Sequence, residues 1–139
     1  MGKNLFGLDL ELGAIDYNTG EANIETDTRI RTIGEIPVIP NETYTISASG
    51  MYSVTVLGYD KDMNYIGSNR DKILPYTFTF KKPNVRYIRF NFRANSSGST
   101  TSLSAISNVQ LEYGDTVTAY EPYNPNNTVY GGYVDIATG

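Results

Sequence analysis

The sequence predicts an all-β fold, a β-sandwich of two packed sheets, and three observations support this. Apolar and polar residues alternate at every second position in several short segments, which is the pattern of half-buried strands. Turn-forming residues separate these segments at roughly even spacing, and no segment keeps a helical period for more than two turns. Large aliphatic and aromatic side chains come from many of the segments, which favours two sheets around one interior, with jelly-roll connectivity.

The expected strands follow this alternation along the chain. Leu8, Leu10 and Leu12 share one face of the first strand, and Ile30 points inward from the second. A polar tip at residues 60–64 joins two strands into a hairpin. The other strands are expected at residues 43–47, 52–59, 65–67, 76–80, 85–93 and 108–112, with a short extended piece between two prolines at 37 and 40.

Composition excludes several classes of function. The 139 residues suffice for one domain with a core, and they contain no His, Cys or Trp, which removes the Ser-His-Asp and Cys-His arrangements, disulfides and zinc sites built on His or Cys. A net charge of −4 argues against nucleic acid as a partner, and no apolar run approaches the roughly 18 residues of a membrane span. Asp9 and Glu11 share a strand face as a glycosidase pair does, but an exposed strand face explains them better. We therefore expect neither catalysis nor a membrane partner.

The polar face of the strand at 85–93 is the main candidate binding surface. Its inward residues are aliphatic and aromatic, and its outward residues recur at every second position over about 20 Å. A saccharide needs forked donors for adjacent hydroxyls and an aromatic plane for its C–H face, and Arg, Asn and Tyr supply both. Arg29 and Arg31 extend this surface if their strand belongs to the same sheet; the alternative is a solvated sheet face with cross-strand pairing. The outward residues of the strand are Tyr87, Arg89, Asn91 and Arg93.

Tyrosines beside predicted turns form a second candidate. Recognition surfaces commonly lie at such turns, although packing at the rim of the core is the alternative. Tyr59 and Tyr65 flank the hairpin tip, and the other tyrosines at or beside turns are Tyr17, Tyr52 and Tyr76. The tip itself matches the first ligand positions of a calcium loop, with Asp71 where the last acidic ligand falls. Tyr65 stands where such loops carry Gly, so no cofactor is expected, and structural calcium stays open.

Several segments in order carry a resemblance to a known family. They resemble the carbohydrate-binding-module-like jelly-roll domains of tail-tip and baseplate proteins (receptor-binding, distal tail or tail-associated) from phages of Gram-positive bacteria. The likeness spans roughly residues 4–123, but it supplies no fixed set of sugar-binding residues. The segments that carry it are residues 28–32, 36–46, 59–61, 87–90, 106–112 and 118–123.

The resemblance implies a domain at residues 1–123, followed at 124–139 by a linker and the start of another module around 128–135. It implies a non-catalytic carbohydrate-binding module of a phage adhesin in the virion, acting outside the host at its surface. The expected partners are host cell-wall polysaccharide or another surface glycan, and other tail or baseplate proteins. Two alternatives stay open: a structural or oligomer-interface domain of the tail tip, and an accessory module of a cell-wall hydrolase.

Overall fold

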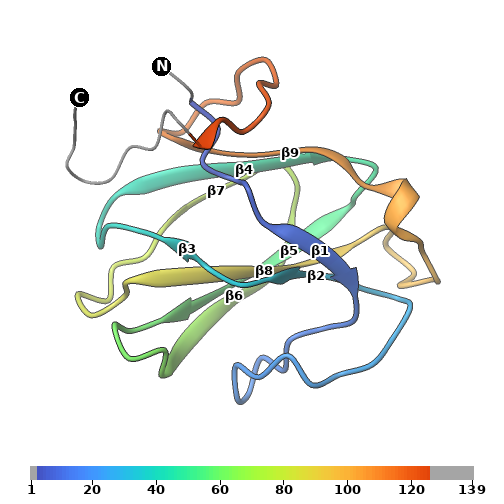
Figure 1. Cartoon of the computed structure of the whole chain (residues 1–139), viewed down its shortest axis with the longest axis horizontal. Helices are drawn as coiled ribbons and strands as arrows, with labels where there is room; N and C mark the ends of the chain where they lie inside the picture. The colour runs from blue at the N-terminus through green and yellow to red at the C-terminus, as the bar shows by residue number, and fades with distance from the viewer. Residues whose placement is uncertain (1–2, 126–139) are drawn as a thin grey trace.

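Two antiparallel β-sheets face each other in the computed structural model, which describes residues 3–125 of the chain (Figure 1). The larger sheet has the order β1-β2-β8-β5-β6, with β3 also paired to β8, and the smaller has the order β7-β4-β9. The predicted two-sheet β-sandwich is thus confirmed, and the chain passes repeatedly between the sheets, as in jelly-roll folds. The strands are β1 (Asp9–Leu12), β2 (Ile30–Ile33), β3 (Ile36–Pro37), β4 (Thr43–Ser49), β5 (Ser53–Tyr59), β6 (Tyr65–Ile73), β7 (Tyr76–Thr79), β8 (Tyr87–Arg93) and β9 (Ser107–Tyr113).

The interior follows from the alternation along the strands. Ile88, Phe90 and Phe92 point inward from β8 and are fully buried, as the sequence predicts. Phe90 lies at the centre of this core, with its ring centroid 6.1 Å from that of Phe6 and 5.8 Å from that of Phe92. Buried aromatic rings contribute large areas to a core, so β8 anchors the larger sheet and fixes which of its residues face outward.

Strand β6 is much longer than the sequence predicts. Pairing with β5 extends from Tyr65 to Ile73, whereas alternation predicts a strand only at residues 65–67. The register shifts twice along this pair, and Asp71 has a positive φ of 51°. Bulges interrupt the alternation of apolar and polar residues. The residues that follow Gly67 are also mostly polar, so the sequence shows no strand pattern there. The part of β6 that the sequence does not predict forms one side of the pocket described below.

The hairpin tip between β5 and β6 is held by its own hydrogen bonds. Asp60 Oδ1 accepts from the backbone amides of Asp62 and Asn64, both at 2.9 Å, and Oδ2 accepts from the Asn64 side chain. The carboxylate of Asp60 therefore closes the turn. In the part of the chain that the structure describes, no three His, Cys, Asp or Glu residues gather in a way that could hold a metal ion.

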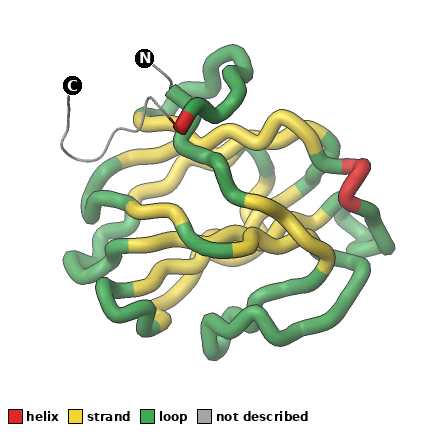
Figure 2. Tube along the Cα trace, in the orientation of Figure 1, coloured by secondary structure: helices red, strands yellow, loops and turns green. Residues whose placement is uncertain are grey.

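The outer faces of both sheets are partly covered by loops. Residues 114–121 lie over β9, where Thr118 donates to Glu112 at 2.6 Å and the Glu121 amide donates to Gln110 at 2.9 Å. Gln110 and Glu112 point away from the interior of the sandwich but are buried, because residues 114–121 cover them and hydrogen-bond to both side chains. On the larger sheet, the long connection between β1 and β2 runs below the strands (Figures 1 and 2).

Two expectations concern other parts of the chain. The predicted following module at 128–135 lies outside the described residues, as does the second half of the linker at 124–127. Among residues 3–125, no helix has the length and hydropathy needed to cross a membrane. The short 3-10 helix η1 (Leu103–Ala105) connects β8 to β9 (Figure 2).

Candidate functional site

Residues 13–28, called the covering segment below, lie against the outer face of the larger sheet and are anchored by Arg31. This arginine is 6% exposed and donates hydrogen bonds to Glu11 at 2.7 Å and to the carbonyl oxygens of Ala14 and Ile24 at 3.0 and 3.2 Å. Its remaining nitrogen lies 3.4 Å from Glu25. The expectation that Arg31 belongs to an open binding surface is wrong, because Glu11 and the covering segment take four of its five N–H donors.

Asn91 provides a second anchor for the covering segment. Its amide side chain accepts from the backbone nitrogen of Ile15 and donates to the backbone oxygen of Ile15, both at 3.0 Å. Asn91 is 8% exposed, so the prediction of an open Asn91 is also wrong. The paired bonds satisfy both backbone groups of Ile15, as a neighbouring strand would. A polar residue at the centre of β8 therefore holds a loop in place.

The three candidate tyrosines line a small apolar cluster under the covering segment. Tyr59 is 2% exposed and packs with Ile15, and its hydroxyl donates to the Gly20 carbonyl at 2.8 Å. The ring of Tyr65 is tilted against that of Tyr59 with a centroid distance of 5.7 Å, and Tyr87 packs against the same cluster. The covering segment packs over these residues. Tyr59 is therefore not the exposed aromatic ring expected from its position beside the hairpin tip. Their packing corresponds to the rim alternative.

Arg89 also binds its own chain. Its guanidinium donates to the carbonyl oxygen of Gly34 at 3.1 Å and to that of Thr32 at 3.0 Å. These bonds hold the turn between β2 and β3 against β8. Arg89 is half-buried and has fewer free donors than an open sheet face implies.

Burial raises the pKa of the Tyr59 phenol above its ordinary value of 10.0, and the nearby Arg89 opposes this increase. An acid with a raised pKa in the folded state stabilises the fold fully below the pKa of the unfolded state and loses that contribution as pH rises towards the folded pKa. We expect the free energy of unfolding to fall more steeply above pH 10 for the parent chain than for Tyr59→Phe, as measured by urea unfolding at a series of pH values. Identical slopes would contradict this role for Tyr59.

A pocket of about 250 Å³ remains open where the covering segment leaves the sheet. Strands β5, β6 and β8 and the covering segment all contribute side chains to its wall. Three of the eight predicted site residues line it, namely Arg29, Asn91 and Arg93. The side chains that give the pocket its polar character also include Tyr17, Ser53, Thr55, Arg70 and Asp71.

Positive charge dominates the pocket. Three arginines (Arg29, Arg70 and Arg93) face one carboxylate, that of Asp71, although the whole chain carries a net charge of −4. The ion pairs that the described residues form involve Arg31 and Lys61 but none of these three arginines. Burial, followed by the repulsion of Arg93, lowers the pKa of Arg29, while Asp71 acts in the opposite sense. The pocket therefore holds like charges that its own residues neutralise only in part.

One aromatic ring stands at the pocket. Tyr17 is 42% exposed, and the guanidinium carbon of Arg70 lies 3.5 Å from its ring centroid, a close cation–π contact. Arg70 extends from β6 and Tyr17 from the covering segment, so this contact joins the loop to the edge of the sheet. It fixes the orientation of the ring while leaving part of it exposed.

Two hydrogen-bond donors at the pocket have no acceptor. Within residues 3–125, the buried side-chain atoms that lack a partner are Ser53 Oγ and Arg93 Nε, and both side chains line the pocket. Leaving a buried donor unpaired costs about 1–3 kcal/mol. An acceptor atom that enters here would recover part of this cost.

Sequence reasoning missed the contributions of β5 and β6 to the pocket. Ser53 and Thr55 were predictable, because Val54 and Val56 face the core and their neighbours must face the other way. Arg70 and Asp71 had no comparable signal, since they lie in the bulged part of β6.

Comparison with known proteins adds no relative, because no protein-family model, no curated protein and no solved structure matches this chain. The site is therefore interpreted from its own geometry. Its residues supply donors, one acceptor carboxylate and an aromatic face on a rigid sheet, a combination suited to holding a polar ligand.

Proposed function

We propose that this chain is a non-catalytic carbohydrate-binding module of a phage tail or baseplate adhesin that recognises a host cell-wall saccharide. The observation that supports this is the pocket between the covering segment and the outer face of the larger sheet. Its floor consists of paired strands, and its wall carries guanidinium and hydroxyl groups beside an exposed tyrosine ring. Sites built on strands hold their side chains in fixed positions, as selective binding requires.

The chemistry of the pocket matches what a sugar ring presents. Guanidinium groups donate in a planar fork that can span two neighbouring oxygens, and the hydroxyls of Ser53 and Thr55 both donate and accept. Tyr17 offers an apolar face with a polar tip, which suits the C–H face of a saccharide. A volume of about 250 Å³ is below the usual range of roughly 300–1,000 Å³ for drug-sized ligands, so one sugar residue is the expected occupant.

The narrower proposal of a phage adhesin rests on the ordered resemblance of roughly residues 4–123 to such domains. A single small pocket would bind weakly, with a dissociation constant on the order of 0.1–1 mM. Many copies on one particle would convert this into firm attachment, because each bound copy raises the effective concentration of the next. Weak individual sites and repeated display are compatible for this reason.

Binding to cell-wall polysaccharides from a panel of Gram-positive bacteria tests the proposal. We expect Tyr17→Ala to weaken binding roughly tenfold, because it removes the aromatic face at the pocket. Tyr120→Ala is a matched control, since Tyr120 is similarly exposed, at 44% against 42%, and does not line the pocket. The measurement is titration of each variant against immobilised polysaccharide, with thermal melting to confirm folding.

Two results would contradict the proposal. The first is an absence of binding to every polysaccharide in the panel. The second is a stable oligomer of the parent chain in which the pocket is covered, which would favour the structural-interface alternative. Size measurement by light scattering and exchange protection around Tyr17 detect the second result.

A further inference from the structure

Arg29 and Arg93 converge at one end of the pocket. A Cβ added to Gly98 would lie 3.7 Å from Nη1 of Arg29 and 4.0 Å from Cδ of Arg93, so both side chains approach the same point of the loop that follows β8. Burial, and after it the repulsion of the neighbouring Arg93, lowers the pKa of Arg29. Two guanidinium groups are thus held together without a carboxylate that pairs with either in the described chain.

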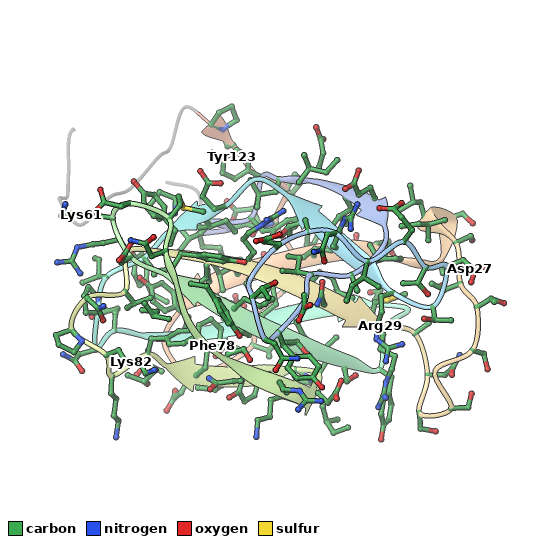
Figure 3. All side chains as sticks on the ribbon, turned by 90° about the horizontal axis from the view of Figure 1, so that it is seen from below. Asp27, Arg29, Lys61, Phe78, Lys82 and Tyr123 are labelled. Carbon is green, nitrogen blue, oxygen red and sulfur yellow. The ribbon has the colours of Figure 1, made fainter. Side chains whose placement is uncertain are left out.

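Two lysines of the molecule lie far from this pair, which shares the pocket with Arg70. Arg29 lies at one end of the sandwich, whereas Lys61 and Lys82 lie at the opposite end (Figure 3). Lys61 pairs with Asp62 at 3.1 Å, and Lys82 donates to the Ile66 carbonyl at 2.6 Å. The local excess of positive charge in the pocket is therefore not part of a general basic surface, and it contrasts with the net charge of −4.

The unpartnered donors indicate what kind of group completes the site. Ser53 is 1% exposed, and its hydroxyl lacks an acceptor, as does Arg93 Nε. Arg93 Nε can only donate, and the Ser53 hydroxyl can donate as well as accept, so an oxygen that accepts hydrogen bonds satisfies both. The neighbouring guanidinium groups favour a negatively charged oxygen. A neutral hydroxyl accepts hydrogen bonds but leaves the repulsion between Arg29 and Arg93 in place.

The charge count also limits the ligand. Asp71 offsets one of the three arginines that line the pocket, so two positive charges remain in excess. One phosphodiester or carboxylate fits this excess, whereas a densely charged polyanion would meet the carboxylate of Asp71 and the acidic remainder of the chain. The small volume is consistent with a single charged substituent on one sugar residue.

We infer that the pocket selects acidic saccharides, with a carboxylate or phosphate group bound by Arg29, Arg93 and Ser53. This inference rests on the proposed function and names the ligand class of the same site. The charged substituent lies at the Arg29 end, and the sugar ring extends towards Tyr17, the exposed aromatic residue of the pocket wall.

A comparison of acidic and neutral polysaccharides tests the inference. The probes are a uronic-acid-containing wall polysaccharide before and after its carboxyl groups are reduced, a phosphodiester-linked wall polymer, and inorganic phosphate at matched ionic strength. We expect the acidic polymers to bind the parent chain at least roughly tenfold more tightly than the reduced polymer, and rising salt to weaken this binding. Inorganic phosphate is expected to compete only at much higher concentration.

Variants of the two arginines test whether these side chains cause the preference for acidic polymers. Arg29→Gln and Arg93→Gln are each expected to weaken binding of the acidic polymers roughly tenfold and to leave that of the reduced polymer nearly unchanged. Arg86→Gln removes the same charge from an exposed position just before β8, roughly 23 Å along the strand from Arg93, and serves as the control. Arg93→Lys keeps the charge without the fork and tests whether a loss in Arg93→Gln reflects misfolding.

The outcomes separate this inference from the proposed function. Equal binding of the acidic and reduced polymers would overturn the inference and leave the proposed function standing. Binding to none of the polymers would overturn the proposed function and the inference with it. Displacement by inorganic phosphate at the same concentration as the sugar residues would identify a site for free anions and overturn the preference for a saccharide.

Discussion

Replacing Arg31 with methionine is expected to lower the free energy of unfolding by roughly 3 kcal/mol and to detach the covering segment from the sheet. Methionine keeps much of the apolar volume but removes every hydrogen bond that Arg31 donates to Glu11, Glu25 and two backbone carbonyls. The two glutamates are 43% and 83% exposed, so they return to water at little cost, and the loss falls mainly on the backbone of the covering segment.

Two measurements check this expectation for Arg31→Met. Urea unfolding gives the change in stability, and hydrogen exchange at the Ile15 amide reports local opening, because that amide donates to Asn91. Arg86→Met is the matched control, since Arg86 is exposed and its removal is expected to change stability by less than about 0.5 kcal/mol. Unchanged protection at Ile15 in Arg31→Met would show that Arg31 does not anchor the segment. We also expect saccharide affinity to fall in this variant, because the covering segment forms a wall of the pocket.

Replacing Gly13 with alanine is expected to cost about 3 kcal/mol in the free energy of unfolding. Gly13 has a φ of +136°, where a side chain is strained by roughly 1–3 kcal/mol. An added Cβ would also lie 2.7 Å from the guanidinium carbon of Arg31, closer than atoms in contact allow. The alanine therefore strains the backbone at the start of the covering segment and displaces the side chain that anchors it.

A substitution at Gly114 distinguishes the two effects of Gly13→Ala, which are backbone strain and the clash with Arg31. Its φ is +97°, but nothing lies within 4 Å of an added Cβ, so Gly114→Ala reports backbone strain without a clash. We expect Gly114→Ala to cost about 1–2 kcal/mol, less than Gly13→Ala. Equal losses of stability in urea unfolding would contradict the clash with Arg31. A further expectation is that only Gly13→Ala raises hydrogen exchange at Ile15.

The sequence was sufficient to predict the faces of the central strands. Alternation in β8 places Phe90 in the core and Arg93 outside, and both positions are confirmed. It was not sufficient to predict which outward residues stay accessible. Asn91 is covered by Ile15, which lies 76 residues away in the chain, and the path of a loop leaves no periodic signal.

The same reasoning explains why the candidate site was only partly predictable. Arg93 belongs to β8 and Arg29 directly precedes β2, where the alternation along the sequence is clear, so both were identified. Arg31 shares that face but lies where the covering segment returns to the sheet, and its burial depends on carbonyl oxygens that no sequence pattern marks. Arg70 belongs to the bulged part of β6, where the period of two is lost.

The apolar cluster beneath the covering segment is distinct from the sandwich interior. Ile15, Leu57 and Tyr59 pack as a group of their own, while Phe90 and its neighbours form the main core. Substitutions along the loop can thus reshape this wall of the pocket without disturbing the packing between the sheets. Under the proposed function, a change in this one connection would alter recognition while the scaffold that folds it stays the same.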